Sequence, residues 1–243
     1  MTAIHSATTG TLYGIGVGPG DPDLLTLKAA KILGTVDVIF AAASTKNDYS
    51  TALQIAAPHL RKDVETMMLG FPMTRDKAAL AIAWQDNAKA VAEVLNSGRS
   101  GAFLTLGDPL IYSTFGYLMR TLTELCPDAN IEVVPGITSY QASAAHTRTI
   151  LCESGENLLL LSGVRDTDSL HAMLAQADNS VILKTYRNFG AIRQVLDATG
   201  KKGETVFISR LGMEGEQIIR NIADAPEKPH YFSHLLIPKS KKD

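Results

Sequence analysis

The stretch LYGIGVGPGDPDLLTLK, residues 12–28, joins the end of an apolar strand to a glycine-rich turn and the start of a helix. Glycine occupies every second position from Gly14 to Gly20, which does not match the dinucleotide fingerprint G-x-G-x-x-G or the P-loop. Pro19 lacks the N–H that an anion cradle needs, and Asp21 would repel a phosphate. The turn is therefore tight and glycine-rich but unsuited to phosphate.

Strand-like and helix-like segments alternate from this stretch to about residue 150. Short apolar runs are expected as strands, and longer runs with an apolar residue every three or four positions as helices. The expected strands are 11–17, 37–42, 65–71, 101–109 and 130–136, and the expected helices are 22–33 with Asp21 as N-cap, 49–60, 77–98, 113–125 and 138–146. This alternation predicts a mostly parallel sheet with helices on both faces.

The pattern changes after residue 150. Strands are expected at 157–163, 180–186 and 204–212 with helices between them, whereas 216–224 and 231–239 follow with almost no helix. Such an ending is typical of a mixed sheet that finishes in antiparallel strands. We therefore expect an α/β protein of two domains, residues 1–150 with a mostly parallel sheet and residues 151–243 with a mixed sheet.

Composition narrows the class of protein. The 243 residues are 45% hydrophobic and 20% charged, with a net charge of −2, which indicates a globular protein and disfavours nucleic-acid binding as its main function. Cys126 and Cys152 are too few for a disulfide framework, and the six histidines show no metal-ligand spacing. No signal peptide and no apolar run of about 18 to 20 residues is present, so we expect a cytoplasmic protein that binds no metal and no membrane.

Three loops that follow expected strands combine glycine and proline with a small polar residue. They are GVGPGDP at 16–22, LGDPLIYST at 106–114 and VPGITS at 134–139, after the first, fourth and fifth strands. Such loops let the backbone approach a ligand closely, and ligands of open α/β sheets bind outside the carboxyl ends of the strands. Each loop alone fits an ordinary turn, but their common position favours a shared cleft.

The motifs GVGPGDPDLLTLKA, GDPLIYST and VPGITS, in this order, resemble the signature of the tetrapyrrole methylases, S-adenosylmethionine-dependent enzymes that act on corrin and sirohaem precursors. The resemblance continues into SVILKTYRN and VFISRLG, and within the family it is strongest to the enzymes that methylate carbon 20 of precorrin-2 or of its cobalt complex. It implies a homodimer whose two domains close over a trough that holds S-adenosylmethionine, with S-adenosylhomocysteine as the product.

The resemblance also implies which residues contact the methyl donor, largely through the backbone of the GDP loop. These are Pro19, Leu106, Gly107, Asp108, Ile111, Thr138, Ser139, Leu183 and Leu211. Leu183 stands where related enzymes often carry methionine, and both Leu183 and Leu211 fit core packing equally well. No catalytic base is assigned, because Asp21 fits a helix cap and Asp108 a residue that shapes its loop or binds the donor.

Family substrates carry acetate and propionate carboxylates, which basic residues would bind. Basic residues near expected strand ends or loops are Arg75, Arg148, Lys184, Arg187 and Arg210. Lys184 and Arg187 form the most suggestive pair and are our expected substrate-binding residues, although each residue alone also fits solvated surface charge.

The sequence is also compatible with other functions. A nicotinamide oxidoreductase would share the α/β alternation, but the glycine fingerprint fails. A methylase that acts at another ring carbon, on RNA or on a protein side chain fits the three loops equally well. The slight negative charge and 6% aromatic content disfavour RNA, and a non-enzymatic binding module would leave the three loops without a purpose.

Overall fold

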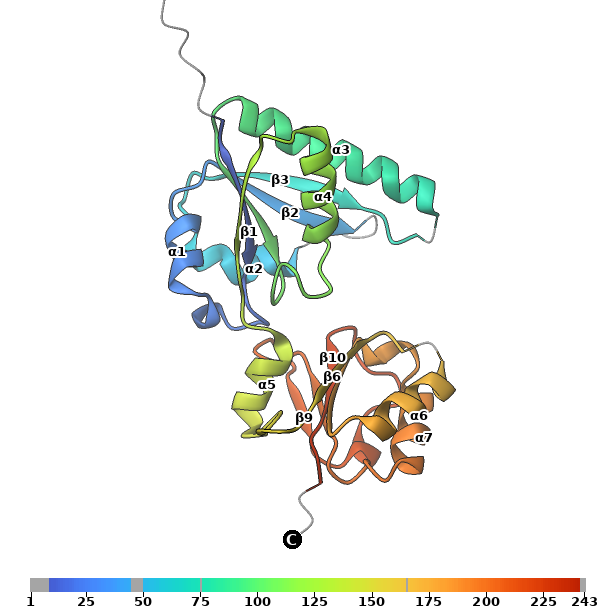
Figure 1. Cartoon of the computed structure of the whole chain (residues 1–243). Helices are drawn as coiled ribbons and strands as arrows, with labels where there is room; N and C mark the ends of the chain where they lie inside the picture. Colours follow the sequence, from blue (N-terminus) through green and yellow to red (C-terminus); the bar gives the residue numbers. More distant parts are fainter. Residues whose placement is uncertain (1–8, 45–49, 75, 165, 241–243) are drawn as a thin grey trace, which may run out of the picture. The chain divides into compact units, whose positions relative to one another are not determined.

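The structure is a computed structural model that describes residues 9–44, 50–74, 76–164 and 166–240 (Figure 1). The chain divides into two units, Met1–Thr138 and Ser139–Asp243, each built around a five-stranded sheet. The division precedes helix α5 (Ser139–Thr147), whereas we expected it after residue 150. The two α/β units, one with a parallel sheet and one with a mixed sheet, confirm the expected fold class.

The first unit is a parallel sheet in the order β3-β2-β4-β1-β5. Its strands are β1 (Thr11–Gly16), β2 (Val38–Ser44), β3 (Glu65–Phe71), β4 (Gly101–Thr105) and β5 (Asn130–Val134), and its helices are α1 (Leu27–Leu33), α2 (Thr51–Ala56), α3 (Lys77–Asn96) and α4 (Phe115–Leu125), with a 3-10 turn at Ala57–His59. All of β4 is buried, because a central strand is covered on both faces, whereas the edge strand β3 is largely exposed.

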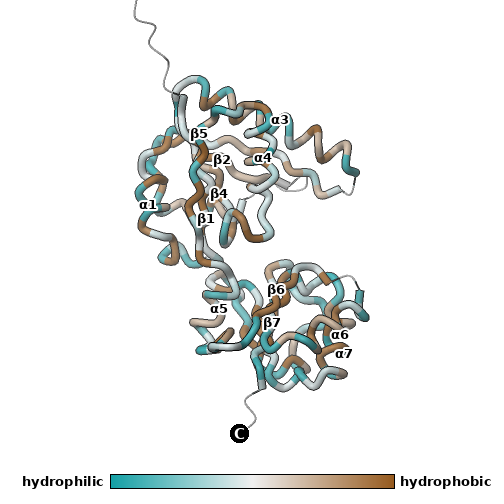
Figure 2. The backbone as a smooth tube through the Cα atoms, in the orientation of Figure 1, coloured by the Kyte–Doolittle hydropathy of each residue, from teal (hydrophilic) through white to brown (hydrophobic). Residues whose placement is uncertain are grey.

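Helices lie on both faces of this sheet. The chain passes from β1 through β2 to β3 in one direction and returns from β3 through β4 toward β5, so right-handed crossovers place α1 and α2 on one face and α3 and α4 on the other (Figure 1). Helices α3 and α4 share a core with the sheet that includes Phe40, Phe103 and Phe115. Figure 2 shows hydrophobic residues concentrated along β6 in the second unit.

The helix expected at 22–33 is interrupted. The Asp21 carboxylate accepts a hydrogen bond from the Asp23 backbone at 2.9 Å, but it caps only a 3-10 turn, Pro22–Leu24. Leu25 is extended, and Thr26 caps the start of α1. The capping role of Asp21 is confirmed, and the continuous helix is wrong because a second capping residue begins a separate helix.

The second unit is a mixed sheet in the order β6-β7-β10-β8-β9, in which β10 is antiparallel to both of its neighbours. Its strands are β6 (Leu158–Ser162), β7 (Asn179–Leu183), β8 (Val206–Ser209), β9 (Gln217–Ile219) and β10 (Ser233–Ile237), and its other elements are α6 (Thr167–Gln176), α7 (Phe189–Ala198) and the 3-10 turns Thr185–Arg187 and Ile222–Asp224. Helices α6 and α7 pack with Leu235 and Ile237 of β10 in one core.

Helix α5 covers the opposite face of this sheet through a buried polar contact. Side chains alternate along β10, so His234 points away from the core that contains Leu235. Its Nε2 lies 2.8 Å from Ser143 Oγ of α5, and both residues are buried. Burial lowers the pKa of His234 from 6.5 to about 4, because the imidazolium loses its hydration.

Substitution of His234 is expected to change how stability depends on pH. Well above pH 6.5 the imidazole is neutral in both the folded and the unfolded chain. As the pH falls toward about 4, the unfolded chain binds a proton that the folded chain does not, so the free energy of unfolding decreases by about 3 kcal/mol. His234→Gln, which keeps a hydrogen-bonding group opposite Ser143, should lose less stability over this range in urea denaturation. A variant with the pH slope of the parent would contradict the assignment.

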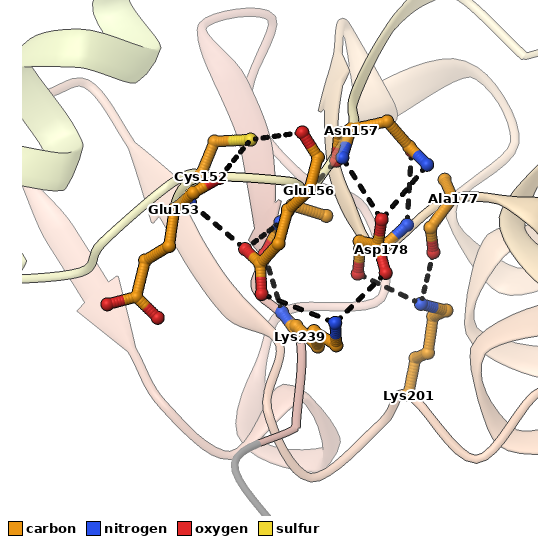
Figure 3. A network of polar contacts seen from close by, with 9 residues as sticks. Cys152, Glu153, Glu156, Asn157, Ala177, Asp178, Lys201 and Lys239 are labelled. Carbon is orange, nitrogen blue, oxygen red and sulfur yellow. Dashed lines mark hydrogen bonds and ion pairs between the residues drawn. The ribbon is translucent and has the colours of Figure 1, made fainter.

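A network of polar contacts closes the other end of the second sheet (Figure 3). Lys239, just after β10, places its Nζ 3.4 Å from Glu156 Oε1 and 3.2 Å from Asp178 Oδ1, which precede β6 and β7. Hydrogen bonds from the Glu153 backbone and then Asn179 lower the pKa of Glu156. The network joins the starts of β6 and β7 to the end of β10, at the end of the sheet opposite to the carboxyl end of β7. We assign it a structural role.

Candidate functional site

The three loops singled out from the sequence lie together because their strands are neighbours. Strand β1 is paired with β4 on one side and with β5 on the other. The connections that leave β1 and β4 pass to opposite faces of the sheet, and ligands of open α/β sheets bind at the carboxyl ends of strands where the connections diverge in this way. The shared position inferred for the loops is therefore present within the first unit.

The loop after β1 is hydrogen-bonded to the loop after β4. The Val17 N–H donates to Thr105 O at 3.0 Å, and the Gly107 N–H donates to Gly18 O at 2.9 Å. Gly18 and Gly107 form an isolated antiparallel bridge, and both have positive φ, +82° and +67°. The two loops thus form one rigid backbone surface, and their glycines permit conformations that other residues adopt at a cost.

The loop after β5 joins this surface by close contact between backbones. A Cβ on Gly136 would lie 2.1 Å from Gly107 O and 2.7 Å from Gly16 Cα. A Cβ on Gly16 would lie 2.4 Å from the same carbonyl oxygen. These distances leave no room for a side chain at Gly16 or Gly136, so glycine at these two positions lets the backbones of the three loops meet. We call this contact of Gly16, Gly107 and Gly136 the glycine junction.

Asp108 holds the glycine junction together. Its Oδ2 accepts a hydrogen bond from the Gly136 N–H at 3.2 Å, and its Oδ1 accepts one from the Leu110 N–H at 2.8 Å. Both carboxylate oxygens are therefore engaged with the backbone of two loops. This arrangement supports a loop-shaping role for Asp108 and argues against its use as a base.

Apolar side chains rise from the GDP loop into solvent. Leu110, Ile111 and Tyr112 are 55%, 38% and 52% exposed, and Tyr112 has a left-handed φ of +50°. The loop then returns to the sheet, where Ser113 Oγ lies 2.8 Å from Thr105 Oγ1. Three adjacent exposed apolar residues on an anchored loop are suited to contact with a ligand. Ile111 is among the expected donor contacts.

The expected residues of the second unit lie at its strand ends. Leu183 ends β7 and is half-buried, and Leu211, two residues after β8, is buried. Lys184 follows Leu183 with a left-handed φ of +56°. Partial burial, and to a smaller extent the charge of Arg187, lower the pKa of Lys184. The negative charge of a ligand beside this ammonium group would offset both effects. Because Leu211 is buried, it fits a role in core packing as well as a role as a donor contact.

The structure separates the expected site residues into two sets. Those of the first unit gather at the glycine junction and its loops, namely Pro19, Leu106, Gly107, Asp108, Ile111 and Thr138. Those of the second unit are Ser139, the first residue of α5, and Leu183, Lys184, Arg187 and Leu211 at strand ends. Arg75 lies outside the described residues.

The sequence did not indicate that residues just before β10 lie beside the expected site residues of the second unit. Because β10 is antiparallel, its start lies beside the carboxyl ends of β7 and β8. Tyr231 and Phe232 precede β10, and the Tyr231 ring packs 5.1 Å from that of Tyr186. A search confined to residues after strands misses them, although the antiparallel ending expected for this sheet was the signal that could have found them.

Within the described residues, no metal-binding cluster, membrane-spanning helix or surface hollow indicates a second ligand site. No group of three or more histidine, cysteine, aspartate or glutamate side chains within 9–44, 50–74, 76–164 and 166–240 could hold a metal ion. Over the same ranges no helix is both long and apolar enough to cross a bilayer. Two surface hollows, about 540 and 210 Å³, lie along α4 and β5 and around Cys126, away from the glycine junction.

Known sequences match most of the length of this chain. The family described as Tetrapyrrole (Corrin/Porphyrin) Methylases matches residues 11–226. The chain is 33% identical to the cobalt-precorrin-2 C(20)-methyltransferase of Salmonella typhimurium, with 95% of this chain and 97% of that protein covered. It is 38% identical to a probable cobalt-precorrin-2 C(20)-methyltransferase of Methanocaldococcus jannaschii, with the same coverage.

Solved structures share the fold at lower identity. A cobalt precorrin-4 methyltransferase matches with a TM-score of 0.74 and 19% identity over 98% of both chains. A uroporphyrin-III C-methyl transferase from Thermus thermophilus, complexed with S-adenyl homocysteine, matches with a TM-score of 0.64 and 23% identity over 94% of this chain and 97% of that chain. These likenesses agree with the two α/β units described above.

Proposed function

This chain belongs to the tetrapyrrole methylase family, and from that premise we propose that it transfers a methyl group from S-adenosylmethionine to carbon 20 of precorrin-2 or cobalt-precorrin-2 in cobalamin biosynthesis. One observation carries this proposal: relatives named for this reaction match nearly the full chain at 32 to 38% identity. The resemblance further supports a homodimer, which sedimentation analysis of the purified protein would test. We also propose a cytoplasmic location.

We infer that the glycine junction and its neighbours bind the donor. Pro19, Gly107 and Thr138 lie at the three loops that meet there, so backbone groups of all three can approach one ligand. Exposed Ile111 offers an apolar contact beside them. The resemblance adds Leu106, Asp108, Ser139, Leu183 and Leu211 to the proposed donor contacts.

The proposed reaction asks mainly for positioning. The sulfonium of the donor is already activated, and a reduced tetrapyrrole has nucleophilic carbons, so displacement needs the two reacting carbons about 3 to 3.5 Å apart and aligned. The rigid loop surface is suited to hold the donor in such a fixed orientation. We assign no base for the proton that leaves the methylated carbon, because Asp108 is already committed to backbone hydrogen bonds.

Anaerobic incubation with the donor and either precorrin-2 or cobalt-precorrin-2 tests this function. Mass spectrometry should detect one added methyl group, and carbon-13 NMR with a labelled donor should place it at carbon 20. Calorimetry should show binding of S-adenosylhomocysteine and no binding of NAD. A methyl group at another carbon would move the chain to a different reaction of the family, and NAD binding without S-adenosylhomocysteine binding would contradict the proposal.

Replacement of Lys184 or Arg187 is expected to weaken tetrapyrrole binding. A charge-assisted hydrogen bond contributes about 1.5 to 3 kcal/mol, so Lys184→Ala and Arg187→Ala should each reduce affinity by roughly ten- to a hundredfold. Affinity for S-adenosylhomocysteine should stay within about twofold. Lys202, which is exposed and 3.1 Å from Asp197, gives the control Lys202→Ala. Parental tetrapyrrole affinity in both test variants would return these residues to solvated surface charge.

A further inference from the structure

An aromatic cluster at the strand ends of the second unit lies beside positive charge. Tyr186, Tyr231 and Phe232 form it, with ring centroids 5.1 Å apart in both neighbouring pairs. Arg187 lies over the Tyr186 ring at 5.6 Å and donates from Nε to the Tyr186 hydroxyl at 2.9 Å. One side of the cluster is therefore flanked by the cation pair Lys184 and Arg187, both already proposed to bind substrate.

A third cation, Arg210, flanks the cluster from β8. Its backbone N–H donates to Phe232 O at 2.9 Å, which joins the end of β8 to the segment before β10. Arg210 has a left-handed φ of +54°, a conformation that is unfavourable for a non-glycine residue. Its Nε is buried and has no hydrogen-bond partner among the described residues.

No carboxylate neutralises Arg210 within the described part of the chain. The same turn holds two acids, Glu214 and Glu216, and among the described residues no ion pair within 4 Å joins either to Arg210. Glu216 accepts a hydrogen bond from the Gly212 N–H at 2.7 Å and lies 3.7 Å from His146 Nε2. Partial burial, and to a smaller extent the charge of Arg210, lower the pKa of His230, so the guanidinium lies close to this imidazole. A half-buried guanidinium in this setting favours an anionic ligand.

The neighbouring turn makes room for the guanidinium. A Cβ on Gly215 would lie 2.7 Å from Arg210 Cζ and 2.8 Å from its Nη1. The absence of a side chain at Gly215 therefore lets the guanidinium pack against the turn. A packed guanidinium is better oriented for a carboxylate than a freely rotating one.

We propose that Arg210 is a specificity-determining residue that binds a carboxylate of the tetrapyrrole while the aromatic cluster contacts the face of the ring. The inference rests on the proposed function and extends it to a second anion position. Lys184 and Arg187 on one side and Arg210 on the other fit a flat ligand with carboxylates on more than one edge.

The test is a fluorescence titration of Arg210→Asn with uroporphyrin, a porphyrin ring that carries acetate and propionate groups. Asparagine tolerates the left-handed conformation better than most residues, so the variant should melt no lower than the parent. Uroporphyrin affinity should fall by roughly ten- to a hundredfold, and S-adenosylhomocysteine affinity should remain. The control Arg193→Gln removes an arginine of α7 that packs on Phe189, and it should leave both affinities unchanged.

Charge and geometry are separated by two further measurements. Arg210→Lys keeps the charge but loses the planar fork, so it should recover only part of the lost affinity. A water-soluble cationic porphyrin should bind the parent poorly and should gain affinity in Arg210→Asn. Parental uroporphyrin affinity in Arg210→Asn, no uroporphyrin binding by the parent, or an equal loss for S-adenosylhomocysteine would each overturn the inference.

Failure of the inference can be told apart from failure of the proposed function. If the parent methylates precorrin-2 and Arg210→Asn does so with the same KM, the function stands and the role of Arg210 is overturned. If the parent methylates neither precorrin while its uroporphyrin binding still depends on Arg210, the function fails and the anion position stands. A raised KM with an unchanged kcat would support both.

Discussion

Gly136→Ala is expected to destabilise the first unit by about 3 kcal/mol or more, or to prevent its folding. The new methyl group would overlap Gly107 O and Gly16 Cα, at 2.1 and 2.7 Å. Gly16 ends β1, and Gly107 and Gly136 follow β4 and β5, so relief would require a shift of β4 or β1 against β5. Urea denaturation and the yield of soluble protein measure the effect.

Gly70→Ala is the matched control for this substitution. Gly70 lies in the edge strand β3, is exposed, and has no atom within 4 Å of the Cβ that alanine would add. Alanine there should be neutral or slightly stabilising, because it reduces the freedom of the unfolded chain. If Gly136→Ala unfolds at the same urea concentration as Gly70→Ala, the loops are less tightly packed than described, and the glycine junction would lose its role.

Gly107→Ala should reduce the affinity for S-adenosylhomocysteine at least tenfold, which corresponds to about 1.4 kcal/mol. Gly107 has a φ of +67°, and a Cβ there would meet nothing closer than Thr138 Cα at 3.7 Å. The methyl group therefore fits the protein but occupies space beside the glycine junction, where we propose that the donor binds. Alanine is the better choice than a β-branched residue, which tolerates positive φ least.

Gly200→Ala separates ligand exclusion from backbone strain. Gly200 follows α7 with a φ of +69° and has no atom within 4 Å of a Cβ, so it imposes the same left-handed cost without the site. Both variants should lose about 1 kcal/mol of stability, and only Gly107→Ala should lose donor affinity in calorimetry. Equal donor affinities in the two variants would remove Gly107 from the proposed site.

Much of the fold could be predicted because local pattern and tertiary position agree. The segment 65–71 was expected as a strand and is β3 to the residue, and the long helix expected at 77–98 is α3. The order of strands was beyond the sequence, because the insertion of β4 between β2 and β1 depends on contacts between distant residues. The prediction of one continuous helix at 22–33 was wrong because this short segment contains two capping residues, Asp21 and Thr26, and each begins a separate helical element.

The candidate site, like the fold, could be predicted only in part from the sequence. Glycine and proline loops after parallel strands were visible in the sequence, and the structure brings three of them to one junction. The left-handed backbone of Lys184 and Arg210 was not visible, since neither residue type favours that conformation. Nor could the sequence show that Tyr231 would lie beside Tyr186, which depends on how β10 pairs.

The central position of β10 has a consequence for the order in which the chain acquires its structure during synthesis. Without β10, no ladder joins β6 and β7 to β8 and β9, so the second sheet consists of two separate strand pairs. The first sheet, in contrast, uses only strands made before residue 135. On the ribosome the first unit can therefore close early, while the second waits for residues 233–237 to leave the exit tunnel.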